Sequence, residues 1–235
     1  MKIAIMQPYL FPYIGYFQLM NAVDKFVIYD DVQYIKNGWI NRNNILLEGD
    51  KHLFTLSIKE DSLCLPINKR NFSPVIDHEI QNLFKTMTYA YKKAPYFQTV
   101  FPFIEKLLLG ISSTRTISSN LTEILCSLVE FLHIKTTMLV SSSIKKDRSL
   151  RGEQKVIYIV NKLGGDCYIN AIGGLNLYSK EAFRDKKISL NFIKSRDIQY
   201  KQLNNVFIPN LSIIDVLMFN SKEKITSYLE EYELL

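Results

Sequence analysis

Two adjacent aspartates, Asp30 and Asp31, directly follow the apolar run FVIY. Neighbouring residues at the end of a strand point in different directions, so we expect at most one of the two carboxylates to face a ligand. A carboxylate there can act as a general base, or can accept hydrogen bonds from sugar hydroxyls or an amine. The alternative is a structural role in the turn that ends the strand. No histidine or further carboxylate lies at metal-ligand spacing, so we expect no metal.

A second group of polar side chains lies in YIKNGWINRNNIL, residues 34–46. Arg42 can bind a phosphate or carboxylate through paired hydrogen bonds, and Lys36 offers a point charge. Trp39, the only tryptophan, offers a flat face to a sugar or a base, and the Asn41 amide can donate. The alternative is a loop whose amides satisfy its own backbone, with the tryptophan as a half-buried anchor.

The loop after the first apolar run, residues 2–6, carries two prolines among several aromatic residues. Pro8 and Pro12 restrict its backbone, so Gln7 and Tyr9 could be presented to a ligand with little conformational entropy left to lose. We expect Phe11, Phe17 and Tyr16 to anchor this segment to the core.

Two further segments combine flexible or hydroxyl-bearing residues with charge. Gly173 and Gly174 follow an apolar run and allow a ligand to approach the backbone, although a lone glycine pair matches neither the dinucleotide fingerprint nor a P-loop. Residues 140–152, VSSSIKKDRSLRG, predict either an anion-binding loop or a solvated loop. Their basic residues are Lys145, Lys146, Arg148 and Arg151.

The histidines and cysteines are widely separated. His78, near the start of a predicted helix, is the histidine best suited to acid–base chemistry near neutral pH, although a structural role is the alternative. The three cysteines form no CxxC pair, which argues against a zinc site and a closed disulfide framework and favours a reducing compartment. We identify no signal peptide and no apolar stretch long enough to span a membrane, so we expect a cytoplasmic protein.

The elements that must position these residues alternate between strands and helices, which predicts a Rossmann-like α/β fold with a parallel or mostly parallel sheet. We expect one domain over residues 1–235, with a helical subdomain at about 74–133 inserted between its two βα halves. Ligands bind beyond the carboxyl ends of such strands, which here are Gln7–Tyr9, Asp30–Asp31, Ser141–Ser143 and Asn170–Gly174. The predicted strands are 2–6, 25–31, 51–59, 137–143, 166–170 and 188–194, and the predicted helices are 15–23, 74–91, 97–109, 120–133, 153–163, 179–184, 211–220 and 221–232.

The composition is that of an ordinary globular protein, with 47% hydrophobic and 22% charged residues and a net charge of +6. The positive charge indicates either attraction to an anion such as a nucleotide or simply a mildly basic surface. The basic residues are scattered and form no long arm, so we expect no sequence-specific binding to DNA.

Several motifs, taken in order, resemble the WbqC-like family of bacteria. They are MQPYLFPYIGYFQLM, DKFVIYDDVQYIKNGWINRNNI, YKKAPYF, YINAIGGLNLY and FIPNLSIIDVLMFN, and they extend over nearly the whole chain. The resemblance implies a role in O-antigen biosynthesis, as a transferase that attaches glycine or a related amino-acid acyl group to an amino sugar. The implied partners are a nucleotide-linked amino sugar and an activated amino acid, either carrier-bound or an aminoacyl-tRNA, with no cofactor.

Carried onto this sequence, the family pattern points to residues in all of these segments. One departure stands out, because many relatives have a histidine just before the Gln-Pro pair, where this chain has Met6. Either that histidine is not obligatory, or His78 or a carboxylate has its role here. The residues indicated are Gln7, Pro8, Tyr9, Asp31, Gln33, Lys36, Trp39, Asn41, Arg42, His78, Tyr91, Pro95, Ser141, Gly173, Tyr178, Ser212 and Asp215.

Together, the residues and the resemblance predict a division of roles. Asp31 is the first candidate for the general base and His78 the second, while Lys36, Asn41 or the backbone near the glycine pair would stabilise the oxyanion. Arg42 and the basic residues of 145–151 would hold the nucleotide phosphates. The alternatives are a non-catalytic nucleotide-sugar-binding accessory protein and a nucleotidyltransferase. The expected substrate-binding residues are Gln7, Tyr9, Gln33, Trp39, Asn41, Arg42, Ser141, Asn170, Gly173, Gly174 and Tyr178.

Overall fold

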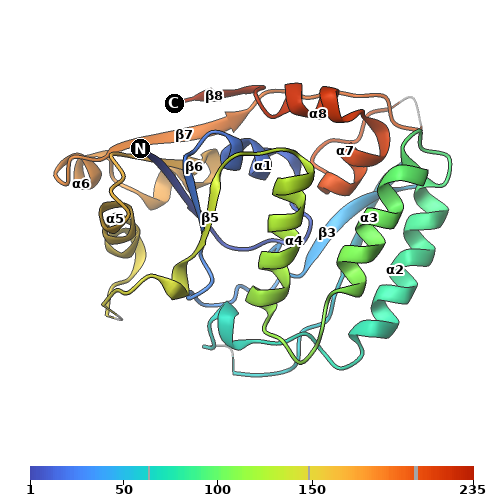
Figure 1. Ribbon diagram of the computed structural model, residues 1–235, viewed down its shortest axis with the longest axis horizontal. Helices are drawn as coiled ribbons and strands as arrows, with labels where there is room; N and C mark the ends of the chain where they lie inside the picture. Colours follow the sequence, from blue (N-terminus) through green and yellow to red (C-terminus); the bar gives the residue numbers. More distant parts are fainter. Residues whose placement is uncertain (63, 148, 204–205) are drawn as a thin grey trace.

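The computed structural model describes residues 1–62, 64–147, 149–203 and 206–235, and it contains a six-stranded sheet in the order β5-β2-β1-β6-β7-β8 (Figure 1). The pairings among the first five strands are parallel, and β8 runs antiparallel to β7. This confirms the predicted α/β class and its mostly parallel sheet. The strands are β1 Lys2–Met6, β2 Lys25–Ile28, β5 Thr137–Val140, β6 Cys167–Ala171, β7 Ser189–Ser195 and β8 Tyr232–Leu234.

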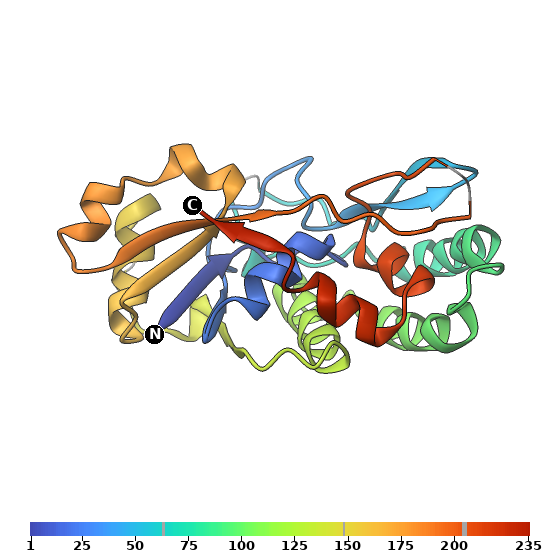
Figure 2. The ribbon, with the colours of Figure 1, turned by 90° about the horizontal axis from the view of Figure 1, so that it is seen from above.

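Helices cover both faces of this sheet and extend it at one end. The three consecutive helices α2, α3 and α4 precede β5 in the chain, and α2 and α3 form the end of the molecule opposite α5 (Figures 1 and 2). No helix in the described part of the chain is both long and apolar enough to cross a membrane. The helices are α1 Ile14–Asn21, α2 Ile76–Tyr91, α3 Phe97–Leu109, α4 Ile117–Phe131, α5 Gly152–Lys162, α6 Lys180–Arg184, α7 Ile213–Phe219 and α8 Lys222–Tyr228, and the short 3₁₀ helices are η1 Ile67–Lys69, η2 Ser141–Ser143 and η3 Ile172–Leu177.

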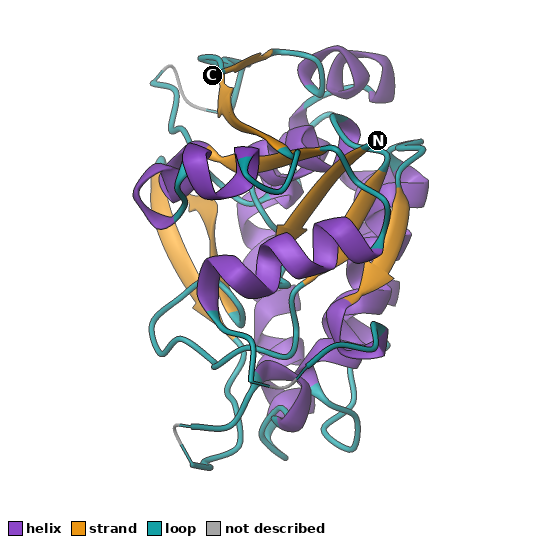
Figure 3. Cartoon of the chain, turned by 90° about the vertical axis from the view of Figure 1, so that its left-hand side faces the viewer, coloured by secondary structure: helices purple, strands orange, loops and turns teal. Residues whose placement is uncertain are grey.

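The alternation of side chains along β1 separates two hydrophobic cores. Ile3 and Ile5 pack with Val156 and Val160 of α5, which lies across the face of the sheet nearest the viewer in Figure 3. Ala4, between them, belongs to the larger core on the opposite face. Because successive side chains of a strand point to opposite faces, a short apolar run buried on both sides is what a central parallel strand requires.

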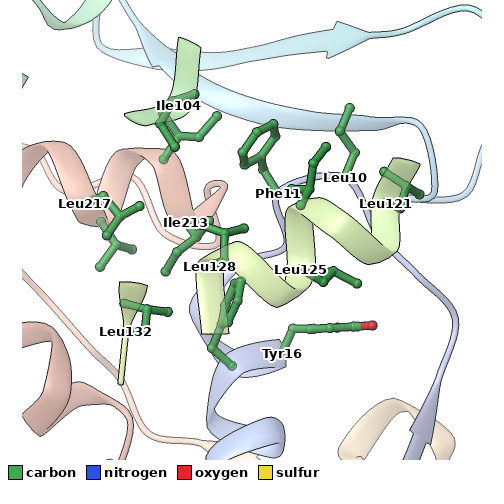
Figure 4. Close-up of a cluster of buried hydrophobic side chains, with 14 of the residues drawn as sticks. Leu10, Phe11, Tyr16, Ile104, Leu121, Leu125, Leu128, Leu132, Ile213 and Leu217 are labelled. Carbon is green, nitrogen blue, oxygen red and sulfur yellow. The ribbon is translucent and has the colours of Figure 1, made fainter. Parts of the chain in front are cut away.

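The larger core joins α4 to α1, α3 and α7. Leu121, Leu125, Leu128 and Leu132 follow one side of α4 at helical spacing and lie against Ile213, Leu217 and the loop residues Leu10 and Phe11 (Figure 4). Thr116 caps this helix, since its side chain accepts a hydrogen bond from the backbone N–H of Ser119 at 3.2 Å. The loop after β1 is therefore anchored by its apolar residues, as expected.

A two-stranded hairpin, β3 Arg42–Leu47 and β4 Asp50–Thr55, was not predicted as such. The alternation in 51–59 predicts a strand, whereas the polar residues of 34–46 predict a binding segment or a loop that satisfies its own backbone. The two turn residues, Glu48 and Gly49, have positive φ, which is the backbone that a tight hairpin turn needs. Asn43 of β3 does not indicate a loop, because its side chain hydrogen-bonds to the backbone of the loop after β1.

The C-terminal helix is shorter than predicted. Helix α8 ends at Tyr228, and Tyr232–Leu234 forms β8, whose residues pair with Ile193–Ser195 of β7. The helical expectation for 221–232 is therefore wrong in its last residues. Pairing with β7 satisfies backbone groups that would otherwise remain open at the edge of the sheet.

Candidate functional site

The strand order places the loop after β1 and the aspartates after β2, Asp30 and Asp31, at the same edge of the sheet. Strand β1 has β2 on one side and β6 on the other, so the order of connections reverses at β1, where open α/β sheets bind ligands. The N–H of Tyr29 donates to the carbonyl of Met6 at 2.7 Å. Gln7 therefore begins its loop beside the segment that carries Asp30 and Asp31.

Asp31 lies at the centre of a cluster of ion pairs. Its carboxylate is 2.9 Å from Nζ of Lys146 and 3.0 Å from Nζ of Lys155, and it accepts a hydrogen bond from the Ser141 hydroxyl at 2.7 Å. Lys155 also donates to the backbone carbonyl of Asp31 at 2.9 Å. The ends of β2 and β5 and the first turn of α5 thus meet in one polar cluster.

The charges of this cluster change the properties of each member. Burial alone would raise the pKa of Asp31, but hydrogen bonds from Lys146, Ser141 and Lys155 together lower it below the ordinary aspartate value. For Lys155, burial lowers the pKa, and the neighbouring Asp31 only partly opposes this effect. Asp31 is therefore a weaker base than an ordinary aspartate, whereas the amine of Lys155 loses its proton more readily than an ordinary lysine.

Lys155 is a site residue that the sequence analysis missed. Only 9% of its side chain is exposed, and Nζ lies 4.8 Å from the centre of the Tyr29 ring. A signal was available, because Lys155 precedes Ile159 by one helical turn and so falls beside the apolar stripe of α5. The predicted anion-binding or solvated loop, residues 140–152, ends before Lys155, and its Arg148 lies outside the described residues.

Asp30 has the structural role that was the alternative for the pair. It is 1% exposed and accepts hydrogen bonds from the hydroxyls of Ser118 at 3.0 Å and Ser142 at 2.7 Å. The backbone N–H of Ser142 donates to it as well, at 2.9 Å. These contacts hold α4 and η2 against the end of β2, so they support the neighbouring Asp31 cluster from behind.

At the end of β6, Asn170 lies against the second residue of the glycine pair, Gly174. Asn170 is 4% exposed, and its Oδ1 accepts from the N–H of Ala171 at 2.8 Å. A Cβ placed on Gly174 would lie 2.5 Å from Nδ2 of Asn170, whereas one on Gly173 would meet nothing within 4 Å. Only Gly174 therefore needs to be a glycine for reasons of space, because the Asn170 side chain packs closely against it.

Substituting Gly174 by alanine is expected to lower the free energy of unfolding by about 1–3 kcal/mol, because the new methyl group forces Asn170 out of its position. Thermal denaturation measures the loss. Gly173→Ala is the matched control and should melt like the wild type, since its methyl group enters open space. Equal melting of both variants would show that the contact with Asn170 tolerates a side chain.

Several predicted binding residues of the 34–46 segment instead stabilise the segment itself. Asn41 is 6% exposed, donates to the Leu56 carbonyl at 2.8 Å and accepts from the Tyr34 hydroxyl at 2.8 Å. Arg42 donates to the backbone carbonyls of Gly38 and Asn37. Because these groups are already engaged, Asn41 is not free to stabilise an oxyanion, and the Arg42 guanidinium is partly occupied.

Of four further predicted residues, Ser141 contacts the Asp31 carboxylate and the other three are exposed. Ser141 is fully buried and contacts the carboxylate rather than open space. Lys36 and Gln33 are exposed in the loop after β2. His78 is exposed on the first turn of α2, beside Asn82, and α2 lies at the opposite end of the molecule from α5 (Figure 1). The structure therefore does not bring His78 together with Asp31.

Tyr9 and Trp39, predicted from separate loops, line one small pocket. The pocket has a volume of about 300 Å³, and the N–H of Leu10 donates to the Trp39 carbonyl at 3.4 Å. Asn43 of β3 supports the wall, since its amide donates to the carbonyls of Leu10 at 3.1 Å and Phe11 at 2.7 Å. The hairpin thus positions the first loop. The pocket is lined by Tyr9, Pro12, Tyr13, Trp39, Asn43 and Asn210.

Gln7 is half-buried, and its carbonyl accepts a hydrogen bond from the Tyr16 hydroxyl at 2.8 Å. This contact fixes the start of the loop to α1.

Among the described residues, no group of three or more histidine, cysteine, aspartate or glutamate side chains is arranged to hold a metal ion.

Comparison with known proteins finds similarity over almost the whole chain. The model of the WbqC-like protein family matches residues 7–227. A protein of Mycobacterium tuberculosis (strain ATCC 25618 / H37Rv), named uncharacterized protein Rv1507c, is 24% identical over 233 residues, which cover 97% of each chain. No solved structure is significantly similar.

Proposed function

This chain belongs to the WbqC-like protein family, and from that premise we propose that it is a cytoplasmic transferase of bacterial surface-polysaccharide (O-antigen) biosynthesis. In this proposal it N-acylates an amino sugar, in nucleotide-linked form, with glycine or another amino-acid-derived group. The observation that carries the chemistry is the buried amine of Lys155, held by Asp31 at the carboxyl edge of the sheet.

The reaction needs a group that accepts a proton. The sugar amine attacks the acyl carbonyl, a C–N bond forms, and the bond between the acyl group and its carrier breaks. The nitrogen must lose a proton, and the departing oxygen or sulfur of the carrier must gain one. Lys155 in its neutral form accepts the first proton and then supplies the second, and its lowered pKa makes that form more accessible at neutral pH.

Asp31 keeps a place in this site with a different role from the one expected. A carboxylate whose pKa is lowered by three donors is a poor proton acceptor, so Asp31 acts as a positioning residue for Lys155 and Lys146. Lys146 also donates to the carbonyls of Ser141 and Ile144, which ties the end of β5 to the same carboxylate. His78 has no part in the proposal, because α2, which carries it, lies at the opposite end of the molecule from α5 (Figure 1).

The small pocket supports binding of the sugar. Tyr9 and Trp39 offer flat apolar surfaces that suit the C–H face of a pyranose ring, and 300 Å³ is near the lower limit for small-molecule sites. The pocket includes Tyr9, three residues beyond Met6, whose carbonyl accepts a hydrogen bond from the N–H of Tyr29. The Tyr29 ring in turn contacts Lys155.

The proposal is tested by mass spectrometry of an amino-sugar nucleotide incubated with the protein, an amino acid, ATP and charged tRNA, and separately with a carrier-bound aminoacyl group. A mass gain of one aminoacyl unit is expected with one of these donors. Failure of every donor would overturn the transferase assignment and favour an accessory binding protein. Exchange or loss of the nucleotide without acylation would favour nucleotidyl transfer.

A further inference from the structure

A second, larger cavity of about 610 Å³ lies at the carboxyl end of β7. Tyr13 and Asn210 line both this cavity and the small pocket that contains Trp39, so the two adjoin. In Figure 2 the chain after β7 continues along the molecule towards α7 and passes beside the hairpin. The large cavity therefore extends the small pocket along the segment after β7. Its volume lies within the range that ligand sites occupy.

Aromatic side chains in fixed positions form part of the cavity wall. The rings of Tyr200 and Phe207 meet edge to face, with 5.0 Å between centres and an angle of 76°. The Tyr200 hydroxyl donates to the buried carboxylate of Asp215 at 2.6 Å, which holds this ring in place. A planar ligand can stack on such a wall without paying to order it first.

The charged residues at the rim of the cavity differ in whether their side chains already have a partner. Lys194 pairs with Glu233 at 3.1 Å, and Asp197 accepts a hydrogen bond from Gln199 at 3.0 Å. Arg196 lines the cavity, and its guanidinium has no partner among the described residues. A guanidinium with its donors free is suited to a phosphate group, which it binds through parallel hydrogen bonds.

We propose that this cavity binds the nucleoside diphosphate portion of the substrate. The base packs on the Phe207 and Tyr200 wall, the phosphates reach Arg196, and the linked sugar passes Tyr13 and Asn210 into the small pocket. The sugar's placement rests on the proposed function, whereas nucleotide binding does not. Arg42, which was expected to hold the phosphates, already donates to its own loop.

The test is calorimetric titration of the full chain with the diphosphates of uridine, thymidine, guanosine and cytidine. At least one is expected to bind, and Arg196→Ala is expected to weaken its binding by about tenfold or more, since a charge-assisted hydrogen bond is lost. Phe207→Ala should weaken it too. Arg184→Ala is the matched control, because Arg184 is exposed on α6 and only pairs with Glu181 at 3.7 Å. Wild-type melting of each variant establishes that it is folded.

Absence of binding by all four diphosphates, or equal affinity of Arg196→Ala and wild type, would overturn the inference. No acyl donor or amine is present in the titration, so its outcome is independent of the transfer reaction. Conversely, aminoacyl transfer with an unchanged KM for the sugar nucleotide in Arg196→Ala would reject this cavity and leave the proposed function intact. Trp39, the only tryptophan, reports on the adjoining pocket, and its fluorescence should change more with the sugar nucleotide than with the diphosphate alone.

Discussion

Replacing Lys155 by methionine is expected to lower kcat for aminoacyl transfer by about 100-fold or more, because a positioned acid–base group contributes at least that much. Methionine keeps an unbranched apolar side chain at this buried position of α5 and removes the amine. The carboxylate of Asp31 would still be paired with Lys146 and hydrogen-bonded to Ser141, so no buried charge is left alone. Initial rates at saturating substrate measure the loss.

Lys162→Met is the matched control for this variant. Lys162 lies on the last turn of the same helix and is exposed, so its substitution tests lysine loss from α5 without touching the cluster. It should retain the wild-type rate. A Lys155→Met protein with near-normal kcat would remove Lys155 from the reaction, whatever the stability of the variant.

The pH dependence of kcat/KM should respond to Asp31 in a defined direction. If the neutral amine of Lys155 is the active form, kcat/KM rises with pH through the pKa of that amine. Asp31 raises this pKa against the larger lowering caused by burial. Asp31→Asn removes the opposing charge, so the pKa of Lys155 falls further and the rising limb moves to lower pH.

A rising limb that stays in place or moves to higher pH in Asp31→Asn would contradict this coupling. A purely structural role for Asp31 would lower the rate without moving the limb. Because the change leaves two lysines near a neutral amide, the melting temperature of the variant is measured first, and rates are compared below it. The expected shift therefore distinguishes a positioning role from general damage.

Much of the candidate site followed from local patterns. Buried parallel strands are short β-branched runs, and their carboxyl ends carry polar residues, which pointed to both Asp31 and Ser141. Their meeting at 2.7 Å is a consequence of β2 pairing with β5, two strands separated by more than a hundred residues. The pairing of Lys146 and Lys155 with Asp31 did not follow from local patterns, because only tertiary structure buries these lysines against the carboxylate.

The roles of the polar hairpin and of the segment after β7 were harder to predict from the sequence, for physical reasons. Asn43 of β3 donates to the backbone carbonyls of Leu10 and Phe11, and in a sequence such a polar side chain resembles a ligand contact. Residues 196–211 have neither helical nor strand periodicity, so nothing marked Arg196. Its cavity is formed by the first loop, this segment and Glu233 of β8, which only the fold brings together.

The second large effect concerns a buried carboxylate that has no cationic partner among the residues that the structure describes. Asp215 on α7 is fully buried and accepts hydrogen bonds from the Tyr91 hydroxyl at 2.9 Å, the Tyr200 hydroxyl at 2.6 Å and the Gln202 amide at 2.8 Å. Asp215→Ala leaves three donors without this acceptor, and each such loss costs about 1–3 kcal/mol. We therefore expect the free energy of unfolding in urea to fall by about 3 kcal/mol or more.

Asp185→Ala, at an exposed aspartate after α6, is the control and should change the unfolding free energy by less than about 0.5 kcal/mol. A similarly small effect at Asp215 would show that its donors find other partners. The variant also bears on the larger cavity, because Tyr200 loses the contact that fixes its ring. Asp215→Ala should thus bind the nucleoside diphosphate more weakly, whereas Lys155→Met should bind it normally.

The pH dependence of stability supplies an independent check on Asp215. Burial raises the pKa of this carboxyl in the folded protein above its unfolded value, against the hydrogen bonds from Tyr200, Gln202 and Tyr91. Its stabilising contribution is then fully present below the unfolded pKa and is lost as pH rises through the folded pKa. The difference in unfolding free energy between wild type and Asp215→Ala should therefore be larger in mild acid than at neutral pH. A difference that grew with rising pH would mean that the three donors outweigh burial and keep the carboxylate ionised.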